Sequence, residues 1–278
     1  SIYISILFYF FFELKNSLKT NNYSLSKLFL LTIIIYITYK INRYSKIGND
    51  DIGHLIGFLI IYKFLNYKNF DLIKIKNICM LSIFILANKF SLIFYCLIPL
   101  FLIIKNLKLF KKIFLSLPTL FFIIWFTKNL LISGCLIYPV KQTCVESFSW
   151  TDIKSIEREK ISGEAWAKDW PNYYDKNDSM KNYITDFNWV ETWSDNHLKL
   201  VIRNFLPFLI FLISIIIYNR NRNKNFLQIH GSDISKRYFY SLSISLIGLL
   251  FFFLKFPLYR YGYSYLVVLI SLISIFFV

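Results

Sequence analysis

Long apolar runs with few charges constrain this chain more than any other feature. Segments rich in Ile, Leu, Phe and Tyr recur from one end of the sequence to the other. A run of about 20 uncharged residues spans the hydrocarbon core of a bilayer as a helix. Charged residues make up 17% of the chain, against about 25% in ordinary soluble domains. The pattern therefore predicts an all-α, polytopic transmembrane helical bundle.

Nine apolar segments are expected to be spans, the first and last of them cut by the ends of the sequence. They are Ile2–Phe12, Leu25–Tyr39, Ile52–Leu65, Ile78–Ala87, Phe90–Ile104, Ile113–Ile132, Leu198–Tyr218, Tyr238–Leu254 and Ser264–Val278. The sequence starts at Ser1 rather than Met and stops within an apolar run. We therefore expect it to be part of a longer protein.

The distribution of charge predicts the orientation. The net charge is +16, and the basic residues gather in the short segments Lys15–Lys27, Lys63–Lys76, Lys105–Lys112 and Arg220–Arg237. The long segment Gly134–His197 instead holds eleven of the sixteen acidic residues and seven basic ones. Because Lys and Arg mark cytoplasmic loops, we favour a membrane protein over a nucleic-acid partner and place the large loop outside the membrane.

This topology divides the chain into three parts. Residues 1–133 are expected to hold transmembrane helices, 134–197 the extracytoplasmic loop, and 198–278 the last helices. The abundance of Ile, Lys, Asn and Phe is typical of an AT-rich bacterial genome, so the expected location is a bacterial inner membrane, with several passes.

One topological choice concerns residues 78–104. They form either one long tilted helix or two short spans that meet at Asn88-Lys89. Only two spans keep every basic loop on the cytoplasmic side. That choice places Asp50, Asp51, Lys89 and Arg260 at the same outer face, where ionisable residues near the membrane boundary are typical of functional sites.

The acidic pair Asp50 and Asp51 follows the second predicted span, in an outer loop at residues 40–51. A carboxylate there can act as a general base or bind a divalent cation, and the plainer interpretation is a helix N-cap. His54, one turn on, is a substrate-binding candidate that we favour as a packed side chain. Lys89 either faces a phosphate or extends its ammonium to the membrane surface.

Arg260 lies where a short loop meets the last span, among Tyr259, Tyr261, Tyr263 and Tyr265. Its planar guanidinium suits a phosphate. Anchoring at the membrane surface by the surrounding tyrosines is the alternative.

The large loop holds two cysteines and five of the six tryptophans. Cys135 and Cys144 are expected to form a disulfide if the loop is in an oxidising compartment. Trp166, Trp170, Trp189 and Trp193 are candidates for stacking on sugar rings, although a small hydrophobic core for the loop is the favoured explanation. Neither a nucleotide-binding motif nor a zinc-protease motif occurs.

Four motifs in order carry a resemblance. Arg43-Tyr-Ser-Lys-Ile-Gly-Asn-Asp51, Asn88-Lys-Phe-Ser91, Asn129 to Pro139 and Tyr259-Arg-Tyr-Gly-Tyr263 look like the signatures of a bacterial family of hypothetical polytopic membrane proteins. The arrangement also resembles the GT-C superfamily of membrane glycosyltransferases, which place an acidic motif in the first outer loop. This chain lacks the Asp-Glu pair common in that superfamily.

The resemblance implies a sugar transfer from a polyprenyl-phosphate donor to a glycan or lipid acceptor, for cell-envelope glycan assembly outside the membrane. Asp50 would then be the base with Asp51 beside it, and Lys89 and Arg260 would hold the lipid phosphate. The need for a cofactor is undetermined, a divalent cation being the candidate. The alternatives are polysaccharide export without catalysis and an O-antigen polymerase or ligase of similar topology.

Overall fold

The computed structural model describes residues 2–19, 24–40, 50–175, 178–221 and 232–276. Within these residues the protein is all-α, and no β-strand occurs. Side chains at positions 50, 219–221 and 232 are not among those described. The predicted all-α class is confirmed.

The helices follow one another with short connections. The first half contains α1 (Ile2–Leu18), α2 (Leu25–Tyr39), α4 (Asp50–Asn66), α5 (Leu72–Asn88), η1 (Phe90–Cys96), α6 (Leu97–Lys105), η2 (Leu107–Leu109), α7 (Phe110–Phe114) and α8 (Leu117–Ser133). The second half contains η3 (Lys141–Thr143), α9 (Ile153–Ala167), η4 (Trp170–Asn172), α10 (Met180–Thr185), α11 (Trp189–Trp193), η5 (Ser194–Leu198), α12 (Lys199–Asn221), α13 (Ser232–Lys255) and α14 (Tyr259–Phe276).

Helix α4 is the centre of the core. It contacts α1, α2, α5, η1, α13 and α14, and Leu55, Phe58 and Phe64 on it are fully buried. The end of α4 and the turn after it are capped from α13, because the buried Arg237 guanidinium donates to the carbonyl of Phe64 in the last turn and to those of Tyr67 and Lys68 just beyond the helix. Since those carbonyls have no partner within the helix, this cation stabilises its C-terminal end.

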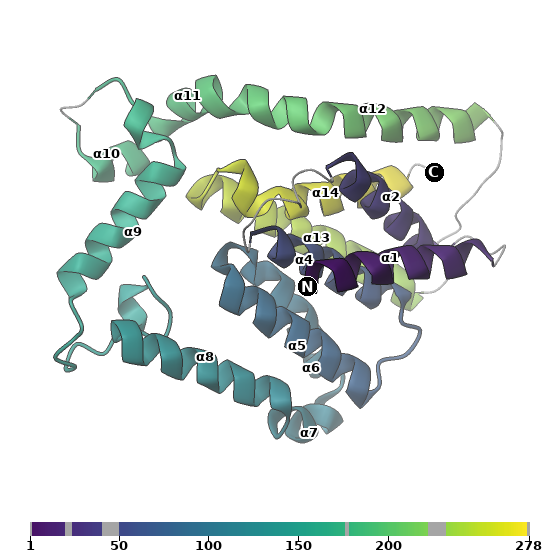
Figure 1. Cartoon of the computed structure of the whole chain (residues 1–278), viewed down its shortest axis with the longest axis horizontal. Coiled ribbons are helices and arrows are strands. Elements are labelled where there is room, and N and C mark those ends of the chain that lie inside the picture. The colour runs from purple at the N-terminus through teal and green to yellow at the C-terminus, as the bar shows by residue number, and fades with distance from the viewer. Residues whose placement is uncertain (1, 20–23, 41–49, 176–177, 222–231, 277–278) are drawn as a thin grey trace.

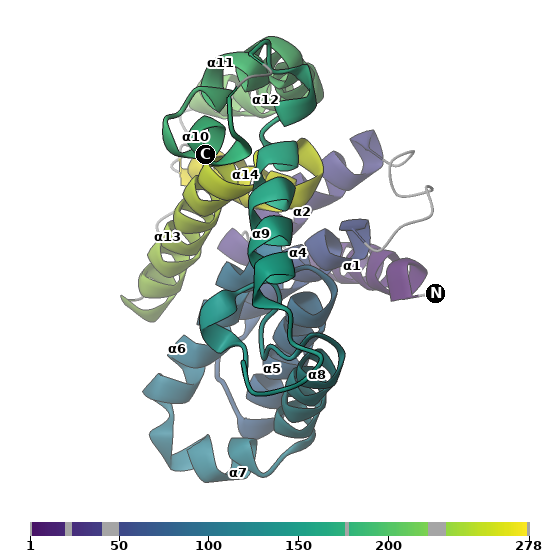
Figure 2. The ribbon, with the colours of Figure 1, turned by 90° about the vertical axis from the view of Figure 1, so that its left-hand side faces the viewer.

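The segment from α8 to α12 packs on this core only in part: α8 contacts α5, and Phe205, Phe208 and Leu212 of α12 belong to the buried cluster. Figure 1 shows α9 on the left, connecting α8 below to α11 and α12 above, and Figure 2 shows α9 running between them from the other direction. Helices α8 and α12 carry many exposed apolar side chains, among them Leu131, Ile132, Ile210 and Ile217. Such surfaces are suited to lipid rather than water.

Three helices are long and apolar enough to cross a membrane: Trp189–Tyr218, Asp233–Lys255 and Tyr259–Phe276. A fourth is possible if Phe90–Lys105 and Leu107–Phe114, which meet at 95°, act as one broken span. Among the described residues, three to four of the nine expected spans therefore meet these criteria, and the other apolar segments form shorter helices. Helices α2 and α8 are apolar but short, and α5 carries Lys74 and Lys76 within its first turns.

The connection at residues 88–89 is a break and not a continuous helix. Helix α5 ends at Asn88, Lys89 adopts an extended conformation, and η1 begins at Phe90. Both η1 and α6 then pack against α5. The choice of two segments over one long helix agrees with this geometry.

The large loop is mostly helical, and its end differs from expectation. The last predicted loop residues belong to one continuous helix from Trp189 to Tyr218, with a π-helical turn at Ser194–Leu198. Near its start, a disulfide joins Cys135 and Cys144. Helix α8 ends in a left-handed Gly134 with φ of 72°, a conformation that glycine adopts without steric cost.

Candidate functional site

The first polar cluster lies where the first turns of α4 and α14 meet. The Asp51 carboxylate accepts a hydrogen bond from the Tyr263 hydroxyl at 3.0 Å. The Tyr263 side chain is 1% exposed, and its ring packs on the rings of His54 and Tyr259. A buried tyrosine therefore fixes the position of a partly exposed carboxylate.

His54 is fully buried beside this pair. Its Nε2 lies 2.9 Å from the Arg260 carbonyl oxygen, and its Nδ1 lies 2.8 Å from the Ser264 hydroxyl. Because a carbonyl oxygen only accepts, Nε2 must carry a proton, and in the neutral ring Nδ1 then accepts from Ser264. The histidine fastens the start of α14 to α4, as the packed interpretation predicted.

Lys89 makes a second bond to the same carbonyl. Its ammonium donates to the Arg260 carbonyl oxygen at 2.5 Å and lies 5.0 Å from the centre of the Tyr261 ring. The side chain is 6% exposed, so it faces the protein and does not extend to the membrane surface. Buried cations require partners of this kind.

Arg260 itself is exposed. Its guanidinium bonds the Tyr261 hydroxyl at 3.1 Å, which leaves it near the surface while Lys89 and His54 hold its backbone. The structure thus brings together Asp51, Lys89, His54 and Arg260 from three distant segments. Asp50 opens α4, but its side chain lies outside the described residues.

The tryptophans of the large loop form a small core. Trp189 and Trp193 pack with Tyr173 and Tyr183, and Trp170 lies against them. Trp189 is 0% exposed and the indole of Trp193 donates to the Pro257 carbonyl at 2.8 Å. Both side chains are almost entirely buried, so we assign both to packing rather than to a sugar.

Trp166 differs from the other three, since its ring is 61% exposed. It is the one of the four candidate tryptophans with an open ring face, Trp170 being half-buried. The structure places it on α9, away from the packed aromatic cluster.

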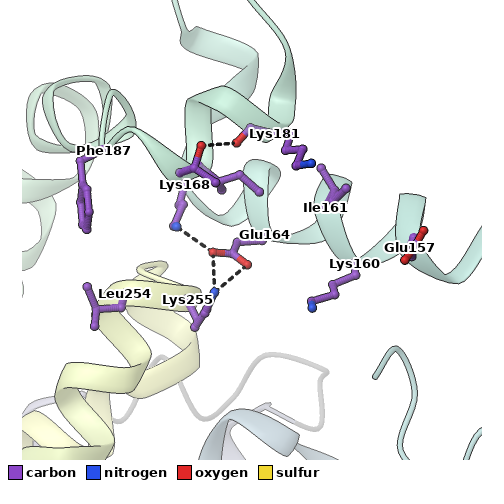
Figure 3. Close-up of a pocket in the computed structure, with 11 residues that line it drawn as sticks. Glu157, Lys160, Ile161, Glu164, Lys168, Lys181, Phe187, Leu254 and Lys255 are labelled. Carbon is purple, nitrogen blue, oxygen red and sulfur yellow. Dashed lines mark hydrogen bonds and ion pairs between the residues drawn. The ribbon is translucent and has the colours of Figure 1, made fainter. Parts of the chain in front are cut away.

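A second site lies between the large loop and the end of α13. A cavity of about 630 Å³ is lined by Lys160, Glu164, Lys168, Lys181 and Lys255, with Glu157 and several apolar side chains around them. Figure 3 shows Lys168 and Lys255 pointing toward Glu164 from opposite sides. We call this the basic cavity.

Glu164 organises the basic cavity. Its carboxylate lies 2.7 Å from the Lys168 ammonium and 3.2 Å from that of Lys255. Burial lowers the pKa of Lys168, while the hydrogen bond to Glu164 opposes this shift. The bond from Lys255 joins the loop to α13, and the Lys168 ammonium also lies 4.7 Å from the centre of the Trp189 ring.

An apolar slot of about 350 Å³ lies on the same helix, α13. It is lined by Trp193, Phe205, Leu250, Phe253, Tyr259 and Tyr263, among others. Two of its walls, Tyr259 and Tyr263, belong to the first polar cluster. We call this the apolar slot.

The basic cavity was not predicted from the sequence, although the spacing of its residues carries a signal. Lys160, Glu164 and Lys168 follow at intervals of four, so they share one face of a helix. Lys255, the other partner of Glu164, lies 87 residues beyond Lys168 (255 − 168). The spacing of residues in the sequence does not predict that contact.

Among the described residues no group of His, Cys, Asp and Glu has the geometry to hold a metal ion. No curated protein and no solved structure matches the chain. A family model described as "Domain of unknown function (DUF8201)" matches residues 1–267. That match covers nearly the whole sequence, and the protein therefore belongs to the DUF8201 family.

Proposed function

We propose that this protein is a membrane glycosyltransferase that uses a polyprenyl-phosphate-linked sugar for cell-envelope glycan assembly on the extracytoplasmic side. The observation that carries the proposal is that the first turns of α4 and α14, which hold Asp51 and Arg260, pack together and are joined by the bond between Asp51 and Tyr263. A carboxylate held by Tyr263 at 3.0 Å supplies a base, and an exposed guanidinium supplies a partner for phosphate.

The chemistry follows from these two groups. The acceptor oxygen forms a bond to the anomeric carbon of the sugar while the bond from that carbon to the lipid phosphate breaks, which inverts the configuration. The acceptor proton passes to the Asp51 carboxylate, and the negative charge that develops on the phosphate lies beside Arg260. Preorganised charge of this kind stabilises a transition state.

Lys89 and His54 have a different role from the one expected of them. Both donate to the Arg260 carbonyl, and both side chains are buried. They are positioning residues, because they hold the first turn of α14 and with it the Arg260 side chain.

The test is complementation of cells that lack the gene, with surface glycan as the readout. Asp51→Asn keeps the shape and removes the base, so glycan transfer should fall about 100-fold or more, with normal accumulation in the membrane. The resemblance instead makes Asp50 the base, so Asp50→Asn is the neighbouring comparison, and a smaller loss than in Asp51→Asn would assign the base to the carboxylate that Tyr263 holds. Full activity of Asp51→Asn would refute the proposed role.

Export of a polysaccharide or its lipid carrier without catalysis is the second candidate. The apolar slot beside Tyr259 and Tyr263 favours it, because such a slot accommodates a lipid chain with or without a reaction. Under this alternative Asp51→Asn would leave glycan export intact, while Leu250→Trp, which fills the slot, would reduce it.

A further inference from the structure

The basic cavity has more positive charge than its own acids neutralise. Four lysines line it, Lys160, Lys168, Lys181 and Lys255, against the two acids Glu157 and Glu164, which gives a formal charge of +2 (4 − 2). The surrounding loop is acidic overall, with eleven acids and seven basic residues. Positive charge is therefore concentrated at this one place in an acidic segment.

Two of these four lysines are not part of an ion pair among the described residues. Glu164 pairs with Lys168 and Lys255, and Glu157 pairs with Lys141 at 2.7 Å from outside the lining. Within the described parts of the chain Lys160 and Lys181 have no ion-pair partner at hydrogen-bond distance. Both are exposed and line the same cavity. The pKa of Glu157 is lowered mainly by its hydrogen bond to Lys141, with Lys160 and Lys181 adding to the shift.

The cavity also has an apolar side. Phe187 and Leu254 line it and are 59% and 45% exposed. Leu250, one turn before Leu254 on α13, lines the apolar slot. Because residues four apart lie on the same helix face, a stripe of α13 leads from the basic cavity to the apolar slot.

The position of the cavity fits a ligand in the membrane. Lys255 is the last residue of α13, a helix long and apolar enough to span a bilayer. A lysine at the end of such a helix lies at the level of the lipid headgroups. The cavity thus offers ammonium groups at that level and apolar side chains beside them.

We propose that the basic cavity binds the phosphate headgroup of a membrane lipid, with Lys160 and Lys181 as its free cationic contacts and the α13 stripe against its apolar part. This site shares no residue with the Asp51 cluster. The inference holds whether or not the protein transfers a sugar.

The experiment uses the whole chain purified in a non-ionic detergent and native mass spectrometry to count bound lipid. The probes are dioctanoyl phosphatidate, dioctanoyl phosphatidylcholine and inorganic phosphate. Saturable binding of one phosphatidate is expected, with at least about tenfold weaker binding of phosphatidylcholine, whose quaternary ammonium opposes the lysines.

The variant Lys160→Gln/Lys181→Gln should weaken phosphatidate binding about tenfold or more, and Lys160→Arg/Lys181→Arg should restore it, since Arg also binds phosphate. The matched control is Lys154→Gln/Arg158→Gln, which removes two exposed charges from α9, the helix of Lys160, at positions outside the cavity lining. Circular dichroism checks that all three variants fold.

Two results would overturn the inference. Equal loss of phosphatidate binding in the control variant would show that general charge and not this cavity attracts the lipid. Binding of inorganic phosphate as tight as that of phosphatidate would show that the α13 stripe contributes nothing and that no lipid is selected.

Discussion

Glu164 joins the large loop to α13 through a partly buried ion pair. It is 8% exposed and holds Lys168, which is 3% exposed, and Lys255 from α13. Removal of one member of a buried ion pair leaves the other charge without compensation, which is more damaging than the net contribution of the pair suggests.

We predict that Glu164→Gln lowers the free energy of unfolding by about 3 kcal/mol, the lower end for a broken buried pair, because the amide keeps the shape but not the charge. Thermal unfolding of the purified protein in detergent measures the change. The matched control is Glu157→Gln on the same helix, whose bond to Lys141 is exposed, and little change in melting temperature is expected. Equal destabilisation by the two variants would contradict the assignment.

At the level of residues, the sequence was informative about which charged side chains lie near one another. The charge rule placed Asp51, Lys89 and Arg260 at one face, and the structure brings these segments into contact. It was uninformative about which atoms meet. The bonds of Lys89 and His54 to a backbone carbonyl depend on the path of α14. Every residue has a backbone carbonyl, so the sequence does not indicate which one accepts a hydrogen bond.

Helices α13 and α14 are packed through two reciprocal contacts between glycine and an aromatic ring. Gly248 of α13 faces the Tyr265 ring of α14, and Gly262 of α14 faces the Phe252 ring of α13. A Cβ added at these positions would lie 2.5 Å from Tyr265 and 2.2 Å from Phe252. Small residues permit such close approach between membrane helices.

We predict that Gly248→Ala and Gly262→Ala each destabilise the protein by about 1–3 kcal/mol, because the added methyl group overpacks the interface. Gly163→Ala is the control: it lies within α9, where an added Cβ meets nothing within 4 Å. That change should be neutral or stabilising by about 0.5–1 kcal/mol, since alanine favours a helix interior. Unfolding in detergent compares the three, and a shift of Gly262→Ala no larger than that of Gly163→Ala would argue against close packing of α13 and α14.

At the level of elements, apolar runs predicted the existence of most helices but not their ends. The run Leu198–Tyr218 was read correctly as apolar, yet its helix starts at Trp189, because the polar turn Ser194–Leu198 continues as a π-helix. Helix α5 starts at Leu72, before the apolar run, where Asp71 accepts from the Lys74 amide as an N-cap. Local capping, which hydrophobicity does not register, sets these boundaries.

The whole molecule combines a buried bundle around α4 with an outer part, α8 to α12 (Figures 1 and 2), in which α8 and α12 expose many apolar side chains. In the most apolar 18-residue stretch of the helix Trp189–Tyr218, only 17% is buried within the protein. A helix so apolar and so little covered is suited to the hydrocarbon of a bilayer. Helix count alone does not fix which loops lie on which side, so orientation rests on charge.

The acidic large loop and the basic segment around η2 are predicted to lie on opposite sides of the membrane, with the loop outside. Single cysteines at Asn172 and Lys108 test this, since both side chains are exposed. The background is Cys79→Ala/Cys96→Ala, which removes the free thiols and retains the Cys135–Cys144 disulfide.

In whole cells, a membrane-impermeant maleimide should label Asn172→Cys strongly and Lys108→Cys weakly, and both should react after the membrane is permeabilised. The parent background should remain unlabelled, because a disulfide has no thiol to react. Labelling of Lys108→Cys but not of Asn172→Cys in intact cells would reverse the orientation. The Asp51 cluster and the basic cavity would then face the cytoplasm, and a donor that is presented outside the membrane would reach neither of them.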